Sequence, residues 1–327
     1  MNKNDKKSER TSTKGLVDRK MITEWSVYKE TTLMDFLLFK MGESKRKTVK
    51  SLLSHHQVAV GGVPVSQFDF RLYPEDVVTV SKRPIAKREV RKLPILFEDD
   101  DILALDKPSG LLSVATEREK GRTAYRLVSD YLVAKDRKAR AFVVHRLDED
   151  TSGVLVFAKN IETREALQHA WQSVVTKRYY YAIVEGQMEE KEATLKDYLA
   201  QDNFQLVYVT RNKEKGKLAI THYKTIAERG SFSLLDIALD SGRKNQIRVQ
   251  LGAKGHYIIG DDKYGDFAVN KTVKSLTGEE GQFLHAAELR FGNVDGPLAN
   301  LRGKTISAPI PPKTKAAIDA LVSSSSL

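Results

Sequence analysis

A histidine, an arginine and three acidic residues share one short connection, HRLDEDTSG at residues 145–153, between the apolar runs FVV and VLVFAK. Asp148 follows His145 by three residues and Arg146 by two. A carboxylate beside a guanidinium stays ionised, because the opposite charge favours the charged form. When partly desolvated, such a carboxylate can act as a nucleophile, as a general base or as a stabiliser of positive charge on a sugar. The segment therefore predicts carboxylate chemistry centred on Asp148.

Three other interpretations of this segment are open on the residues alone. A hairpin loop with solvated acids has the same composition and performs no chemistry. A metal site would use His145, Asp148 and Asp150, although no further cluster of histidines and acids accompanies them. A glycosidase would pair Asp148 with Glu149 or Asp150, although adjacent residues of a strand point apart.

The charge balance favours a polyanionic partner. The 327 residues include 54 Lys and Arg against 43 Asp and Glu, a formal net charge of +11. Such a surplus is typical of proteins that bind nucleic acid or an anionic membrane. No apolar run approaches the roughly 18–20 residues that span a bilayer, and no apolar segment follows the basic start as a secretory signal requires. The chain has no cysteine, which excludes disulfides, thiolate metal ligands and cysteine nucleophiles. We therefore expect a cytoplasmic protein that acts on nucleic acid.

A small module is predicted ahead of the charged segment. Residues 1–20 form a basic tail, and residues 21–82 form the module. Apolar spacing predicts one helix up to Met41 and a second helix capped by Ser44. The stretch QVAVGGVPV predicts a hairpin that turns at Gly61 and Gly62. Four basic residues crowd the second helix: Lys45, Arg46, Lys47 and Lys50.

The rest of the chain predicts an α+β domain with a mostly antiparallel mixed sheet. A basic linker at residues 83–93 leads into this domain at 94–312, and residues 313–327 are expected to be a tail. Helical spacing is clear only at residues 123–136 and 162–175. Short strand-like runs fill the remainder: ILALDKP, FVVHRLD, GVLVFAK, RYYYAIVEG, FQLVYVT, LAITHYKTIA, SFSLLDIAL and NQIRVQLGA.

The segment HRLDEDTSGVLVFAKN resembles the signature of the RluA-type RNA pseudouridine synthases. Four further segments resemble the family's motifs in the expected order: DKPSGLLS, RYYYAIVEG, SGRKNQIRVQLGAKGHYIIGDDKYG and FLHAAELRF. The resemblance runs from about Lys107 to Phe291, with departures at Lys244, Asn245 and Gln250. It implies a pseudouridine synthase fold and the isomerisation of uridine to pseudouridine, with no cofactor and no metal.

The same resemblance implies three catalytic residues. Asp148 would be the essential carboxylate, acting either on the anomeric carbon or as a base toward the ribose. Tyr180 would stack on the uracil, while Tyr179 and Tyr181 point to the opposite face of their strand and are expected to be core. Arg248 would pair with Asp148 and keep it ionised.

Several basic residues are expected to contact RNA. Arg243 is the second candidate for the partner of Asp148, and otherwise a phosphate ligand. His145 and Arg146 are expected to hold the loop or to contact a phosphate of the flipped nucleotide. Residues 31–82 resemble the alpha-L RNA-binding motif of a small-subunit ribosomal protein, which implies phosphate contacts from the four basic residues of the second helix.

These implications favour ribosomal RNA as the substrate, transfer RNA as the alternative, and a monomer. A second function, of a different class, uses the same basic module. In this alternative the chain is a non-catalytic RNA-binding or ribosome-assembly factor, and the large domain is a scaffold.

Overall fold

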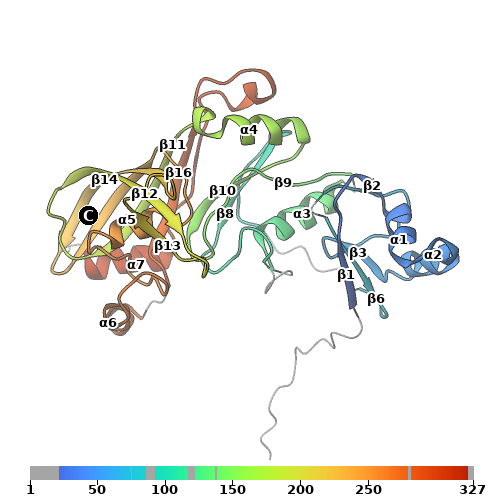
Figure 1. Cartoon of the computed structure of the whole chain (residues 1–327), viewed down its shortest axis with the longest axis horizontal. Helices are drawn as coiled ribbons and strands as arrows, with labels where there is room; N and C mark the ends of the chain where they lie inside the picture. The colour runs from blue at the N-terminus through green and yellow to red at the C-terminus, as the bar shows by residue number, and fades with distance from the viewer. Residues whose placement is uncertain are drawn as a thin grey trace, which may run out of the picture. The chain divides into compact units, whose positions relative to one another are not determined.

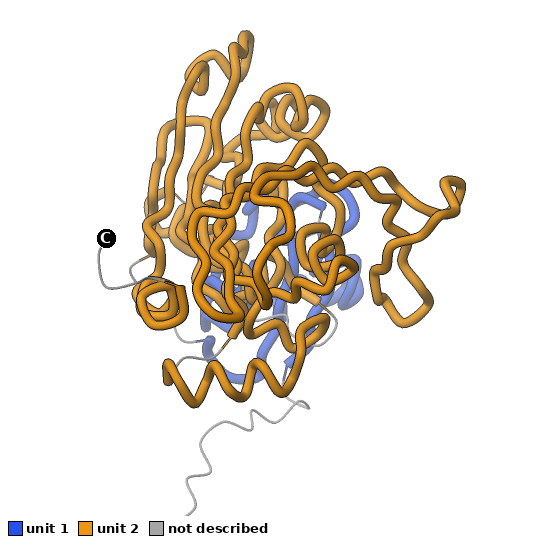
Figure 2. Tube along the Cα trace, turned by 90° about the vertical axis from the view of Figure 1, so that its left-hand side faces the viewer, with its two compact units in different colours: residues 1–89 blue, residues 90–327 orange. Residues whose placement is uncertain are grey.

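The computed structural model describes residues 22–74, 76–85, 93–116, 122–136, 138–278 and 281–322. It divides into two compact units, residues 1–89 and residues 90–327 (Figure 2). The predicted tail at residues 1–20 lies outside the described residues, as does most of the predicted linker, residues 86–92.

The first unit combines small sheets with two helices. One sheet has the strand order β1-β6-β3-β4, and β2 pairs with β5. Figure 1 labels β1, β3 and β6 of this sheet. The helices pack their apolar residues against the sheet in one buried cluster that includes Leu33, Leu37 and Val49. The elements are β1 (Ile22–Ser26), β2 (Thr31–Thr32), α1 (Leu33–Met41), η2 (Glu43–Lys45), α2 (Arg46–Ser54), β3 (Val58–Val60), β4 (Val63–Pro64), β5 (Arg71–Leu72) and β6 (Val77–Ser81).

Two local predictions for this unit have different outcomes. Gly61 and Gly62 join β3 to β4 with φ of 56° and 79°, the left-handed conformation that a two-residue hairpin turn needs. The predicted N-cap at Ser44 is wrong. Glu43–Lys45 form a 3-10 turn and α2 begins at Arg46, with no side-chain hydrogen bond at its start.

The second unit is built on an 11-stranded sheet. Nine strands follow the order β13-β12-β14-β15-β11-β16-β10-β8-β7, while β17 pairs with β16 and β9 pairs with β10. Its pairs are antiparallel except β10 with β16, which confirms the expected α+β class with a mostly antiparallel mixed sheet. Its strands are β7 (Ile95–Glu98), β8 (Ile102–Lys107), β9 (Phe142–Val143), β10 (Ser152–Ala158), β11 (Val175–Glu185), β12 (Glu192–Gln201), β13 (Val207–Thr210), β14 (Lys217–Arg229), β15 (Phe232–Leu239), β16 (Leu284–Phe291) and β17 (Thr305–Ser307).

Helices cover both faces of this sheet. On the β8–β10 half, α3 packs with Leu105 and Leu155, while α4 packs on the opposite face with Ala104 and Val154. On the β11–β15 half, α5 packs on one face, and α6 and α7 pack with Ile183 on the other. The helical elements are α3 (Ala124–Lys135), α4 (Ile161–Val174), α5 (Gln246–Gly252), α6 (Phe267–Thr277), η3 (Gly296–Leu301) and α7 (Pro312–Leu321).

The structure corrects two predictions for this unit. The run NQIRVQLGA was expected to be a strand, but it forms α5, in which every residue from Gln246 to Leu251 is buried. An apolar alternation does not separate a strand from a helix that is buried on all sides. The predicted tail from residue 313 is also wrong, because α7 buries Ala317, Ile318 and Leu321 in the core.

In the residues that the structure describes, no helix is both long and apolar enough to cross a bilayer.

Candidate active site

The connection between β9 and β10 carries Asp148 into a cavity of about 1070 Å³. We call the lining residues that come from strands β11 and β16 the floor: Arg178, Tyr180 and Leu284. We call the basic residues of the surrounding loops the rim: Arg146, Arg243 and Lys244. The end of α4 closes one side with residues that include His169, Trp171 and Gln172.

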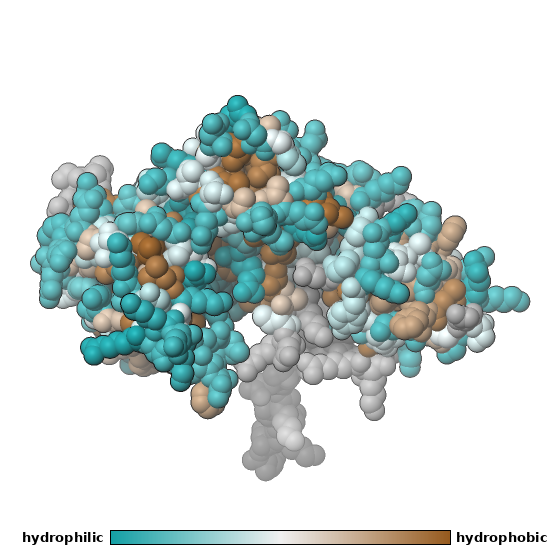
Figure 3. All heavy atoms as spheres, turned by 45° about the horizontal axis from the view of Figure 1, so that its top comes forward, coloured by the Kyte–Doolittle hydropathy of each residue, from teal (hydrophilic) through white to brown (hydrophobic). Residues whose placement is uncertain are grey.

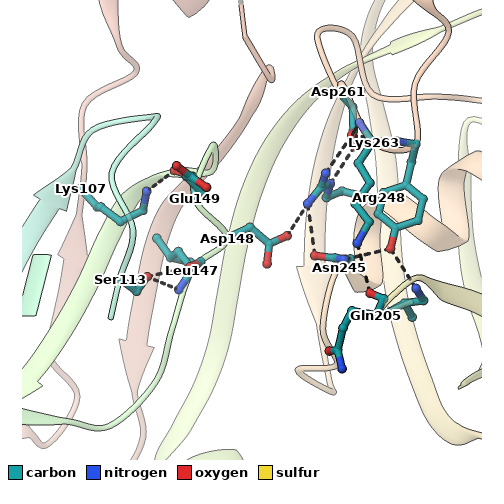
Figure 4. A network of polar contacts seen from close by, with 12 residues as sticks. Lys107, Ser113, Leu147, Asp148, Glu149, Gln205, Asn245, Arg248, Asp261 and Lys263 are labelled. Atoms are coloured by element: carbon teal, nitrogen blue, oxygen red, sulfur yellow. Dashed lines mark hydrogen bonds and ion pairs between the residues drawn. The ribbon is translucent and has the colours of Figure 1, made fainter. Parts of the chain in front are cut away.

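Asp148 points across the cavity toward Arg248 on α5 (Figure 4). The Arg248 Nη1 atom donates to the Asp148 Oδ2 atom at 2.9 Å, while Nε and Nη2 bind the two carboxylate oxygens of Asp261 at 2.7 and 2.8 Å. Burial alone would lower the pKa of Arg248, but Asp261 and then Asp148 raise it overall. Asp261 therefore fixes the charged guanidinium with two nitrogens, and Nη1 is left to hold Asp148 by one hydrogen bond.

Asn245 and Tyr264 also contact the Arg248 guanidinium. Asn245, a departure from the usual motif, has φ of 54°; its Oδ1 accepts from Arg248 Nη1 at 3.1 Å and its Nδ2 donates to the Tyr264 hydroxyl at 2.9 Å. The Tyr264 ring lies 5.0 Å from the Arg248 guanidinium carbon. Asn tolerates the left-handed conformation better than most residues, so the substitution preserves a tight start to α5.

Tyr180 lies between the two halves of the sheet. Its ring packs against the apolar clusters beneath both α3 and α5. Burial raises the pKa of its phenol, the charge of Arg178 opposes this rise, and Asp148 adds to it. The phenol is thus neutral and within electrostatic reach of both charged groups. Tyr179 and Tyr181 were expected to be core, but both are only half-buried.

The remaining expected site residues divide by burial. His145 stacks on Trp171, with ring centroids 4.5 Å apart, and its Nε2 accepts from the Val156 N–H at 2.9 Å. Burial, with a smaller effect of Arg178, lowers the pKa of His145 to about 3. This neutral ring holds the loop and does not supply a charge to a phosphate. Arg243 donates to the Leu218 carbonyl, and of the two expected partners it is Arg248 that pairs with Asp148 in the described residues.

Comparison with known proteins identifies the family. A family model described as RNA pseudouridylate synthase matches residues 101–253. The uncharacterized RNA pseudouridine synthase YlyB of Bacillus subtilis is 31% identical over 282 residues, which cover 83% of this chain and 88% of that protein. This chain belongs to the RNA pseudouridine synthase family. It spans 66% of another Bacillus subtilis relative, the uncharacterized RNA pseudouridine synthase YhcT, and 63% of ribosomal large subunit pseudouridine synthase D of Borreliella burgdorferi, each 32% identical.

Solved structures show the same fold. The human RNA pseudouridylate synthase domain containing 4 matches with a TM-score of 0.57 at 19% identity, over 69% of this chain and 92% of that chain. The human RNA pseudouridylate synthase domain containing 1 matches with a TM-score of 0.50 at 19% identity, over 73% of this chain and 100% of that chain. The pseudouridine synthase fold expected from the sequence is confirmed.

Two buried side chains that the residue pattern did not single out, Lys107 and Ser113, hold the loop at residues 145–153. The Lys107 Nζ atom, fully buried, donates to the backbone carbonyls of Pro108, Leu111 and Glu149 at 3.0, 2.7 and 2.7 Å. The Ser113 hydroxyl donates to the Leu147 carbonyl at 2.6 Å and accepts from the Leu147 N–H at 3.0 Å. These bonds flank Asp148 on both sides and fix its backbone (Figure 4).

A close approach of two strands fixes the far end of the loop. Gly153 has φ of 109°, and a Cβ there would overlap the Ala286 carbonyl oxygen. Next to it, the Ser152 hydroxyl bonds Nδ1 of buried His285 at 2.9 Å. The small residues of TSG therefore allow β10 to lie against β16 directly behind the site.

We expect replacement of Lys107 to lower the free energy of unfolding by an amount that depends on pH. Desolvation, opposed by Asp150, Asp148 and Glu149, lowers the pKa of Lys107 from 10.5 to about 8. Between these values the unfolded chain binds the extra proton, so this group makes the free energy of unfolding rise with pH, by about 1.4 kcal/mol per unit.

Urea unfolding of wild type and Lys107→Met at pH 7.5 and 9.5 measures this effect. Lys107→Met is destabilised at both pH values because it leaves the carbonyls of Pro108 and Leu111 without their partner, each costing about 1–3 kcal/mol, while the Glu149 carbonyl keeps the Gly110 N–H. The deficit grows at pH 9.5. A deficit that stays constant or shrinks contradicts the assigned burial of a lysine.

Proposed function

We propose that this protein isomerises uridine to pseudouridine in RNA, and that its substrate is large-subunit ribosomal RNA. One observation carries the proposal. The Asp148 carboxylate lies 2.9 Å from the buried Arg248 guanidinium, in a cavity of about 1070 Å³ whose floor includes the aromatic ring of Tyr180. Family membership makes uridine the nucleoside that this site takes.

Each catalytic role follows from position. Asp148 faces the cavity and acts on the ribose of the flipped nucleotide, at the anomeric carbon or as a base. Arg248 orients that carboxylate and keeps its charge. Tyr180 presents a ring on which uracil can stack, which contributes about 1–3 kcal/mol per base. Extruding the nucleotide costs a few kcal/mol, less in a loop than in a duplex.

Three observations support ribosomal RNA. Relatives from Borreliella burgdorferi and Nitrosomonas europaea are each named ribosomal large subunit pseudouridine synthase D. The net charge of +11 favours a polyanion, and hydrophilic residues cover most of the face seen in Figure 3. We further propose a monomer, because the cavity of a single chain holds Asp148, Tyr180 and Arg248, and the cytoplasm as the site of action.

Tritium release from carbon 5 tests the activity. The protein is incubated with ribosomal RNA and, separately, transfer RNA, each carrying uridine tritiated at carbon 5. Release from ribosomal RNA that exceeds release from transfer RNA supports the full proposal, and the reverse order replaces the substrate. No release above an Asp148→Asn control from any cellular RNA rejects the enzyme and leaves the non-catalytic RNA-binding factor.

The basic helix of the first unit is proposed to bind phosphates. Lys45, Arg46, Lys47 and Lys50 are all exposed on η2 and α2. Replacing the four by Gln in the full chain is expected to weaken RNA binding and to reduce the slope of log affinity against log salt by about 3. Filter binding over a range of salt concentrations measures it. Lys271→Gln with Lys315→Gln, on helices that do not line the cavity, is the control. An unchanged slope for the fourfold variant contradicts the role.

A further inference from the structure

One buried cation in the active-site cavity has no role in the mechanism above. Arg178 lies on β11 two residues before Tyr180, lines the same cavity and is 8% exposed. Its Nη2 atom donates to the Leu239 carbonyl at 3.0 Å, the one hydrogen bond of this side chain to the residues that the structure describes. Its Nε atom is buried with no hydrogen-bond partner in the described residues. Within the same residues, no carboxylate lies within ion-pair distance of the guanidinium.

This burial is unfavourable in the empty protein. Burial lowers the pKa of Arg178, while the more distant Tyr180 and Asp240 raise it only in part. An arginine removed from water without a carboxylate partner costs several kcal/mol. Arg248, with comparable burial, has Asp261 and Asp148 to offset that cost. A cation held in a cavity without such compensation is typical of a site that receives negative charge from a ligand.

The guanidinium also has an open side. Gly242 lines the cavity beside it, and a Cβ at this position would lie 3.0 Å from Arg178 Nη1. The absence of a side chain at residue 242 therefore leaves room for a ligand atom next to Nη1. In the described residues no hydrogen bond is made by this nitrogen, so its N–H groups are available to a ligand.

We propose that Arg178 is a catalytic residue that donates hydrogen bonds to a carbonyl oxygen of the uracil ring and stabilises the ring while it is detached. This inference rests on the proposed function. The position on the floor favours the base over a phosphodiester. The phosphates of a flipped nucleotide stay joined to the rest of the RNA and remain at the rim, where Arg146, Arg243 and Lys244 lie.

The chemistry explains why a cation is needed there. When the N1–C1′ bond breaks, its electron pair stays on the uracil and the ribose becomes electron-poor. Asp148 compensates this loss by bonding to the anomeric carbon or by removing a ribose proton. The charge spreads over N1 and the two ring oxygens, so a donor at one oxygen binds the detached ring more strongly than the neutral substrate. After the ring turns, an electron pair at carbon 5 forms the C5–C1′ bond, and the Asp148 oxygen leaves carbon 1′ or, if Asp148 acted as a base, the ribose regains its proton. Carbon 5 then loses its proton and N1 gains one. No external reductant or oxidant takes part.

The test compares two leaving groups under single-turnover conditions. Arg178→Met, Arg178→Lys and the matched control Lys177→Met, an exposed neighbour on the same strand, are assayed with enzyme in excess. One RNA carries uridine tritiated at carbon 5, and the other carries 5-fluorouridine, whose consumption is followed by chromatography of the digested nucleosides. Fluorine stabilises the detached ring by withdrawing electrons, so this substrate depends less on the protein cation.

We expect Arg178→Met to lower the rate on uridine by about 10²–10³-fold, as loss of one oxyanion donor does. The loss is smaller on 5-fluorouridine, Arg178→Lys is intermediate, and Lys177→Met matches wild type. Should Arg178→Met fail to fold, the substrate dependence of the charge-retaining Arg178→Lys variant decides.

Three outcomes overturn the inference. They are an unchanged rate, an equal loss on both substrates, and weaker RNA binding with a shallower salt slope, which would mark a phosphate contact. Wild type that releases no tritium from any RNA rejects the proposed function as well. An active wild type with a normal Arg178→Met rejects this inference alone.

Discussion

Asp148→Asn is expected to reduce tritium release by about 10⁴-fold or more, the scale of removing a group that reacts with the substrate. The amide keeps the size of the side chain and can still accept from Arg248. The carboxylate is 30% exposed, so its neutralisation has a small effect on folding. Filter binding is therefore expected to give RNA affinity close to that of wild type.

A second acid in the same loop provides the control for this experiment. Asp150 does not line the cavity, and Asp150→Asn is expected to retain turnover. Two results would contradict the assignment. Turnover in Asp148→Asn near the wild-type level would remove Asp148 from the chemistry. A large loss of RNA affinity in the same variant would make Asp148 structural.

Arg248→Met is expected to lose both stability and turnover. The substitution leaves Asp261, whose side chain is 1% exposed, as an unpaired buried carboxylate, which costs about 3–5 kcal/mol in the free energy of unfolding. It also frees Asp148 to leave its reactive position, a misplacement that costs on the order of 10²-fold in rate. Arg248→Lys is expected to recover little, because one ammonium cannot bind Asp261 with two nitrogens and reach Asp148 as well.

A double variant separates the two effects. Asp261→Asn combined with Arg248→Met removes the unpaired charge, so urea unfolding should show much of the stability restored. Tritium release should stay low, because Asp148 still lacks its partner. Full recovery of turnover together with stability would show that Arg248 acts through folding alone.

The sequence predicted the reactive residues of the site better than the buried residues that hold them in place. Asp148 and Arg248 were identified by family motifs, and the structure places them 2.9 Å apart. The residues alone could not choose Arg248 over Arg243, because the interpretation of α5 as a strand hid the helical turn that joins Arg248 to Asn245. Alternation along β11 placed Tyr180 opposite to its neighbours, but it gave no information on which face meets the cavity.

Lys107 and Arg178 show why other features were missed. Lysine and arginine are among the residues least often buried, so composition and spacing give no reason to expect either inside. Their burial depends on contacts between segments far apart in the chain, such as Lys107 with the Glu149 carbonyl. Helix α7 was missed because the core that its apolar face joins, including Ile183 and Leu234, comes from distant strands that its own sequence does not reveal.

The parallel contact between β10 and β16 consists of two residue pairs, Ser152 with His285 and Gly153 with Ala286. Asp148 precedes β10, in the β8–β10 half of the sheet. Arg248 lies on α5, which packs on the β11–β15 half, so the two residues lie on opposite sides of this short contact. The Asp148–Arg248 ion pair therefore links the two halves of the sheet. Because the backbone joins β10 to β16 by only two residue pairs, the alignment of Asp148 with Arg248 depends on their own side-chain contact as well as on the sheet.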